Sequence, residues 1–142
     1  MRTRDCVPAE LRRALEDLFG DSVDDVVVRE RSWFAWLHGR ARATTRRNTI
    51  YLRGTLDEFL DDPELMLHEY FHVLRQWGTG QLTIPRYLGE CFRHGYWDNR
   101  FEVEAREFTA SEIFRYRALL AQHRTESLPP GVHPIRRKSA AQ

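Results

Sequence analysis

The stretch PELMLHEYFHVLRQW, residues 63–77, decides the fold, because it carries the order His-Glu-Tyr-Phe-His from His68 to His72. On an α-helix, residues four positions apart lie one above the other on the same face. The imidazoles of His68 and His72 are therefore expected to point at one metal ion, with the Glu69 carboxylate beside them. In this H-E-x-x-H arrangement two histidines bind Zn²⁺ and the glutamate acts as general base on a water molecule.

The flanking residues predict a helix independently of the motif. Asp62 is a good N-cap residue, Pro63 suits the first helical position, and Gly78 suits the position just past the end. The motif also arises by chance, and the two histidines would then be ordinary polar groups at a helix surface. The capped helix and a candidate third ligand downstream favour the metal site.

Length and composition narrow the class of protein. A chain of 142 residues with 42% hydrophobic residues predicts one folded domain, which we place at residues 1–125, and a flexible tail at residues 126–142. The net charge of +1 and two cysteines argue against a nucleic-acid or membrane partner and against a disulfide framework. Without a long apolar run or a signal-peptide core, the expected location is cytoplasmic.

The hydrophobic pattern predicts an α+β fold. Residues 26–53 are expected to form a small antiparallel β-sheet, whose arginines we interpret as a solvated hairpin face rather than a nucleic-acid site. A short turn of helix is expected at residues 55–62. Longer helices are expected at residues 8–19, 63–77, 85–93 and 100–123.

The last of these helices offers the third metal ligand. A catalytic zinc usually has three protein ligands and one open position. Glu102 and Glu104 lie on different faces of the helix, so only one of them is expected to reach the histidines. Glu102 has a competing role as capping-box partner of Asn99, and Glu104 has one in a salt bridge to Arg100.

Together these motifs resemble a known family. H-E-x-x-H, followed by a helix with Glu102-Val103-Glu104-Ala105 and then Phe108, is similar to the gluzincin-type metallopeptidases, and most similar to small bacterial domains with a minimal zincin fold. The resemblance extends over about residues 26–108. The family's E-x-x-A pattern implies Glu102 as the third ligand, with Glu104 as the alternative. Related families often have Asp or Asn where this chain has Arg106, so Asp98 or a backbone carbonyl is expected to orient the histidines instead.

The resemblance implies a zinc-dependent metallopeptidase that hydrolyses a peptide or protein substrate, with Glu69 as general base. The alternative is a zinc-binding, zincin-like interaction module with little or no activity. The resemblance further implies that residues 48–52 pair with extended substrate through main-chain hydrogen bonds. Candidates for stabilising the transition state are Tyr96, Tyr116, His94 and His123. The sequence leaves bond preference and oligomeric state open.

Overall fold

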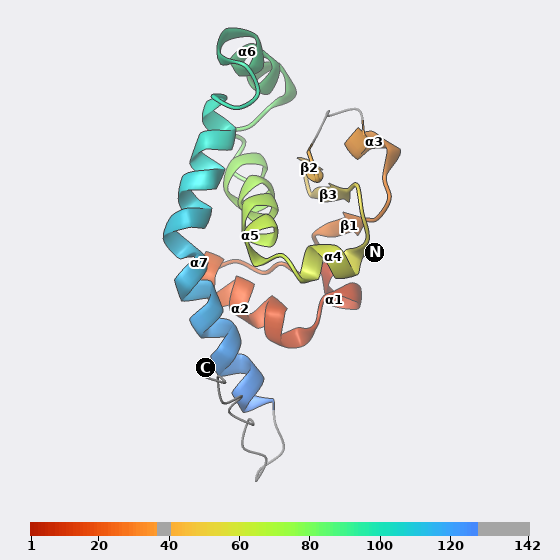
Figure 1. Cartoon of the computed structure of the whole chain (residues 1–142), viewed down its shortest axis with the longest axis vertical. Helices are drawn as coiled ribbons and strands as arrows, with labels where there is room; N and C mark the ends of the chain where they lie inside the picture. Colours follow the sequence, from red (N-terminus) through yellow and green to blue (C-terminus); the bar gives the residue numbers. More distant parts are fainter. Residues whose placement is uncertain (37–40, 128–142) are drawn as a thin grey trace, which may run out of the picture.

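The computed structural model describes residues 1–36 and 41–127, and it has the predicted α+β architecture. Figure 1 shows the sheet on one side of α5 and the long helix α7 on the other, with α6 at one end of the molecule. The helix α5 (Pro63–Phe71) therefore lies in the middle, with its two faces available to the sheet and to α7 (Arg100–Glu126). None of the helices in the described ranges is both long and apolar enough to span a bilayer.

The N-terminal helices pack on the C-terminal part of α7 (Figure 1). A short helix α1 (Thr3–Cys6) precedes α2 (Ala9–Phe19), and the amphipathic helix predicted here is confirmed. Gly20 ends α2 with a positive φ of 73°, a conformation that glycine adopts without steric cost. The buried face of α2 contributes Leu15 and Phe19 to a core shared with α5, α7 and the sheet.

The sheet has three strands in the order β1–β3–β2: β1 (Val27–Arg29), β2 (Ala43–Arg46) and β3 (Thr49–Leu52). β2 and β3 form the predicted antiparallel hairpin, which turns at Arg47 with φ 52°. β1 and β3, however, are parallel, so the prediction of an antiparallel sheet is wrong for this pair. After β1 the chain passes through α3 (Trp33–Trp36) and β2 before β3 pairs with β1. The chain therefore reverses its direction twice, and β3 runs the same way as β1.

A capped helical segment leads from the sheet to the metal motif. Thr55 and Glu58 form a capping box at the start of α4 (Leu56–Leu60), and the Asp62 side chain accepts a hydrogen bond from the Leu65 amide at the start of α5. The predicted helix over residues 63–77 has the expected extent, but its second half, η1 (His72–Trp77), is a π-helix. Such wider turns occur mostly as local insertions, often at functional sites.

The two remaining helices differ in how they pack. α6 (Ile84–His94) runs from its N-cap Thr83 to Gly95 and buries none of its residues. α7 begins after the Asn99 cap and buries a stripe along much of its length, which includes Phe101, Ala105 and Tyr116. The predicted tail at residues 126–142 lies outside the described residues beyond Ser127 and stays a prediction.

Candidate metal centre

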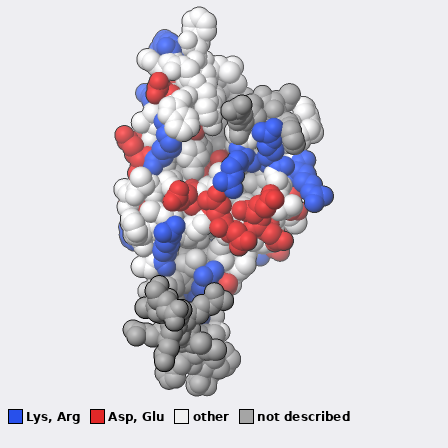
Figure 2. All heavy atoms as spheres, viewed as in Figure 1, with Lys and Arg blue, Asp and Glu red and all other residues white. Residues whose placement is uncertain are grey.

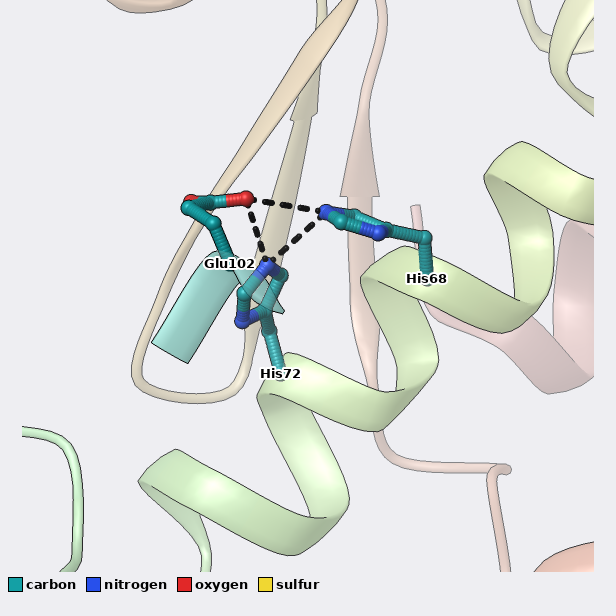
Figure 3. Close-up of side chains that lie close together, drawn as sticks. All are labelled: His68, His72 and Glu102. Atoms are coloured by element: carbon teal, nitrogen blue, oxygen red, sulfur yellow. Dashed lines mark hydrogen bonds and ion pairs between the residues drawn. The ribbon is translucent and has the colours of Figure 1, made fainter. Parts of the chain in front are cut away.

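Three side chains from two helices converge on one point (Figure 3). His68 Nε2 lies 3.0 Å from His72 Nε2 and 3.1 Å from Glu102 Oε2, and His72 Nε2 lies 3.5 Å from Glu102 Oε2. α5 supplies His68 and its π-helical extension supplies His72, while Glu102 is in the first turn of α7. His72 and Glu102 are buried and His68 is half-buried.

The triangle of ligand atoms has the right size for zinc. In a tetrahedral centre with bonds of roughly 2.0–2.2 Å, neighbouring ligand atoms are roughly 3.3–3.6 Å apart. The observed separations of 3.0, 3.1 and 3.5 Å need only a slight opening to match. Two imidazole nitrogens and one carboxylate oxygen are also a donor set that zinc accepts in catalytic sites. These three residues are therefore placed to bind a divalent metal ion.

Glu69 lies beside the triangle with one oxygen unused. The side chain is only 3% exposed, and its Oε2 has no hydrogen-bond partner among the described residues. Burial raises the pKa of Glu69, although the nearby His72 and His68 act in the opposite direction. A buried carboxylate without a partner is costly unless the site supplies one. The Oε2 atom of Glu69 is therefore placed to accept a hydrogen bond from a group that enters the site.

Gln76 fixes the orientation of His72 and connects it to α7. Its Oε1 lies 2.6 Å from His72 Nδ1, and its Nε2 donates to the Phe101 carbonyl at 3.0 Å and to Glu104 Oε2 at 3.1 Å. Because the amide oxygen only accepts, His72 Nδ1 carries the proton and Nε2 keeps its lone pair for a metal. Asp98 or a backbone carbonyl was expected to orient the histidines. For His72 the orienting group is the Gln76 side chain instead.

Glu102 reaches the histidines and Glu104 does not. Burial alone would raise the pKa of Glu102, but the hydrogen bonds and charges of His68 and His72 outweigh it and hold the pKa well below its usual range. The second oxygen of Glu102 accepts a hydrogen bond of 2.9 Å from the Tyr87 hydroxyl. Glu104 is exposed and contacts Gln76 instead.

The Glu102 side chain does not form the expected capping box with Asn99. The Asn99 side chain accepts a hydrogen bond from the Phe101 amide, and the Glu102 carboxylate points away from the cap toward the histidines. Tyr87, which orients that carboxylate, was not predicted. It lies fifteen residues before Glu102 on a different helix, so helical spacing carries no signal for the pair.

The centre opens into a cleft with two lobes. The smaller lobe, of about 320 Å³, is lined by β2 and by apolar side chains such as Phe34 and Leu82. The larger lobe, of about 1040 Å³, extends toward α7 and includes Arg106. His68, Glu69 and several neighbours line both lobes, so the cleft passes directly over the candidate centre.

The strand that borders this cleft is β2 rather than β3. Ala43, Thr44, Thr45 and Arg46 line the smaller lobe, and β2 has no further strand on its outer side among the described residues. The prediction that residues 48–52 pair with substrate is therefore wrong, because β3 is central and already paired on both sides. β2 is the edge strand that borders the cleft.

Of the four candidates for stabilising a transition state, Tyr96 is the one that borders the cleft, where it lines both lobes. The other three belong to different surroundings. Tyr116 is buried in the core, His123 Nε2 lies 2.7 Å from Asp17 Oδ2, and His94 is exposed near Glu90. Burial raises the pKa of Tyr96, which keeps its hydroxyl protonated and able to donate.

The arginines near the hairpin do not form a uniform basic surface. Arg42 donates to Asp62 at 2.6 Å, and Figure 2 shows acidic side chains over α4 directly beside the basic ones. Mixed charge of this kind is typical of a solvated face. The expectation that nucleic acid is not a partner stays a prediction.

Comparison with known proteins places the chain in a family. A family model described as the eCIS core domain matches residues 6–80, just over half of the chain. The matched part contains the sheet and the helix with His68, Glu69 and His72, and it ends before α6 and Glu102. No curated protein and no solved structure matches. With its zincin-like helix and its His-His-Glu cluster, this chain belongs to the eCIS core domain family.

Proposed function

We propose that this protein is a zinc-dependent metallopeptidase of the gluzincin type, in which Glu69 is the general base. The observation that carries the proposal is the unpartnered, buried Oε2 of Glu69 beside three converging ligand atoms in an open cleft. A purely structural zinc site would have a closed set of four ligands and no need for such a group.

The residues divide into holding and reacting groups. His68, His72 and Glu102 would hold the ion, and zinc bound there would supply a Lewis acid that lowers the pKa of water and polarises a carbonyl group. Glu69 takes a proton from the attacking water and delivers it to the leaving amine. Its position beside the three ligand residues suits this role, since a general base must lie within reach of the proton that it takes.

The edge of β2 holds the substrate. In an antiparallel pair, every second residue directs its main-chain groups away from the partner strand. The Arg53 amide donates to the Arg42 carbonyl, so the alternation leaves Ala43 and Thr45 facing outward. An extended peptide that adds to this edge lies across the cleft that contains Glu69. The Tyr96 hydroxyl is the donor that we assign to the oxygen of the reacting carbonyl.

The variant Glu69→Gln tests the proposal. It removes the base and leaves the ligands in place, so we expect one zinc per chain, by elemental analysis, and a loss of about 10²–10⁴ in the rate of hydrolysis of an unfolded protein. Glu107→Gln, which changes an exposed carboxylate on α7, is the matched control and should keep full activity. Undiminished cleavage by Glu69→Gln would contradict the mechanism. A parent protein that binds zinc and cleaves nothing would favour the interaction module instead.

A further inference from the structure

α6 exposes an apolar stripe at one end of the molecule. Ile84, Leu88 and Phe92 are spaced four residues apart and are 45%, 60% and 94% exposed. Residues at this spacing share one face of a helix. Figure 2 shows that this end of the molecule is largely uncharged on the face in view. A contiguous apolar surface of this kind on a folded protein commonly marks an interaction site.

The stripe continues into the cleft of the candidate centre. Ile84 and Leu88 line the smaller lobe, and Leu88 also lines the larger one. Phe34, on the sheet side, and Leu82 line the smaller lobe with them. α6 is therefore one wall of the cleft, and its exposed face is the outward extension of that wall.

Trp97, just beyond α6, is an exposed aromatic side chain that is nevertheless held in place. It is 68% exposed and lines the larger lobe. Arg106 donates to the Trp97 carbonyl at 2.5 Å, and its guanidinium carbon lies 4.3 Å from the centre of the indole ring. An aromatic group that is already ordered loses little entropy when a ligand packs on it.

We propose that the α6 stripe and Trp97 form a docking surface for large apolar side chains of an extended polypeptide, so that the substrates are unfolded segments with such residues next to the cleaved bond. This inference rests on the proposed function, because the surface belongs to the same cleft. The opposite rim of the cleft is the β2 edge, whose outward N–H and C=O groups are a template for pairing with another main chain. A polypeptide supplies both the main chain and the apolar side chains, whereas a lipid surface supplies only the latter.

Peptide binding by the zinc-loaded Glu69→Gln protein tests the docking surface without turnover. Two fluorescein-labelled decapeptides of equal charge are compared by anisotropy, one with Phe-Leu at its centre and one with Ser-Gln. We expect the apolar peptide to bind at least about tenfold more tightly. Adding Leu88→Ser should reduce this advantage by about three- to tenfold. Adding Phe114→Ser, which removes an aromatic that is 75% exposed on α7 and away from the cleft, should leave it unchanged.

Several outcomes would overturn the inference. The first is equal affinity for the two peptides, and the second is an equal effect of Leu88→Ser and Phe114→Ser. The third is a lack of peptide preference in a protein that instead forms a dimer, or binds anionic vesicles, through a contact that Leu88→Ser abolishes. Cleavage of the peptides by the parent protein separates this inference from the proposed function. Cleavage of both peptides at equal rates, unaffected by Leu88→Ser, removes the docking surface and keeps the peptidase. Preferential binding without any cleavage keeps the docking surface and removes the peptidase.

Discussion

Gln76 is the residue through which the two helices of the metal centre are joined. It accepts from His72 and donates to the Phe101 carbonyl on α7, so one buried amide orients a ligand and fixes the distance between the helices. A ligand that is held in one tautomer and one orientation binds metal with less loss of entropy. The strength of the site thus depends on a side chain that does not contact the ion.

Replacing Gln76 by Leu should weaken zinc binding by about 10–100-fold, because His72 loses its acceptor. Competition with a zinc-binding dye measures this effect. Gln81→Leu, at an exposed position five residues later, is the control and should bind zinc like the parent. Unchanged zinc affinity in Gln76→Leu would show that His72 is oriented by packing alone.

Tyr87→Phe removes the hydrogen bond to the second oxygen of Glu102. We expect zinc affinity to fall by about 10–100-fold, the value of one hydrogen bond to a charged group, while the melting temperature changes little. The same dye competition measures the affinity, and circular dichroism follows the fold. A loss of fold with unchanged affinity would mean that Tyr87 supports packing rather than Glu102.

At this scale the sequence predicted His68, Glu69, His72 and Glu102, and the structure brings these four together. Their spacing on regular helices limits where the side chains can point, so pattern alone is informative. Gln76 and Tyr87 escaped prediction for a different reason. Gln76 lies four residues after His72, a spacing that places both on one helix face, but its contacts with α7 depend on tertiary packing. The role of Tyr87 depends on the approach of α6 to α7, which tertiary packing also sets.

Among the elements, β2 has two different sides, one paired with β3 and the other bordering the cleft. Thr44 is hydrogen-bonded toward Tyr51 of β3, whereas Thr45, one residue later, directs its main-chain groups to the cleft. An edge strand normally needs protection against unwanted pairing. Here the cleft occupies the space beside that edge.

Proline substitutions at Thr44 and Thr45 test the two sides of β2 independently. Thr45→Pro removes an outward N–H, so we expect KM for peptides to rise about three- to tenfold with the fold retained. Thr44→Pro removes an N–H that β3 needs and should lower the melting temperature instead. Steady-state kinetics and thermal unfolding distinguish the variants. A normal KM for Thr45→Pro would remove β2 from the substrate site.

The ends of elements were more predictable than the pairing of strands. Asp62 caps α5 as its side chain predicts, and Thr83 and Asn99 cap α6 and α7 in the same way, because capping is a local hydrogen bond. The parallel pairing of β1 with β3 has no comparable local signal. It follows from how the crossover through α3 packs on the rest of the chain, which a short run of β-branched residues does not encode.

For the whole molecule, a metal ion at this site would connect the sheet-bearing half to the long C-terminal helix. A ligand that binds only the folded state stabilises it by about 2.7 kcal/mol at a hundredfold excess over its Kd. We therefore expect a chelator to lower the melting temperature and added zinc to restore it. His68→Ala should melt at the same temperature with and without chelator. Chelator sensitivity that persists in His68→Ala would place the metal elsewhere.

Without metal, the stability of the molecule should depend on pH through His72 and Glu102. Burial lowers the pKa of His72, but the hydrogen bond and charge of Glu102 outweigh it and raise the pKa above 6.5, while that of Glu102 falls below 4.5. The raised histidine stabilises the fold at low pH and loses this effect as pH rises through its folded pKa. The depressed carboxylate stabilises above 4.5 and loses this effect on acidification.

His72 and Glu102 together should thus contribute most to the stability of the fold between about pH 4.5 and 6.5. Thermal unfolding of chelated protein across this pH range measures the contribution, and Glu102→Gln should flatten the profile. A profile that is identical in Glu102→Gln would show that the pair does not control stability.

Glu102 follows His68 by 34 residues, and α6 is made between them. During synthesis the two rings emerge first and hold at most a weakly bound ion, since an incomplete donor set binds metal poorly. The complete donor set therefore forms only once α7 has docked on α5. A motif of five residues carries the two imidazoles, but only the folded chain carries the complete site.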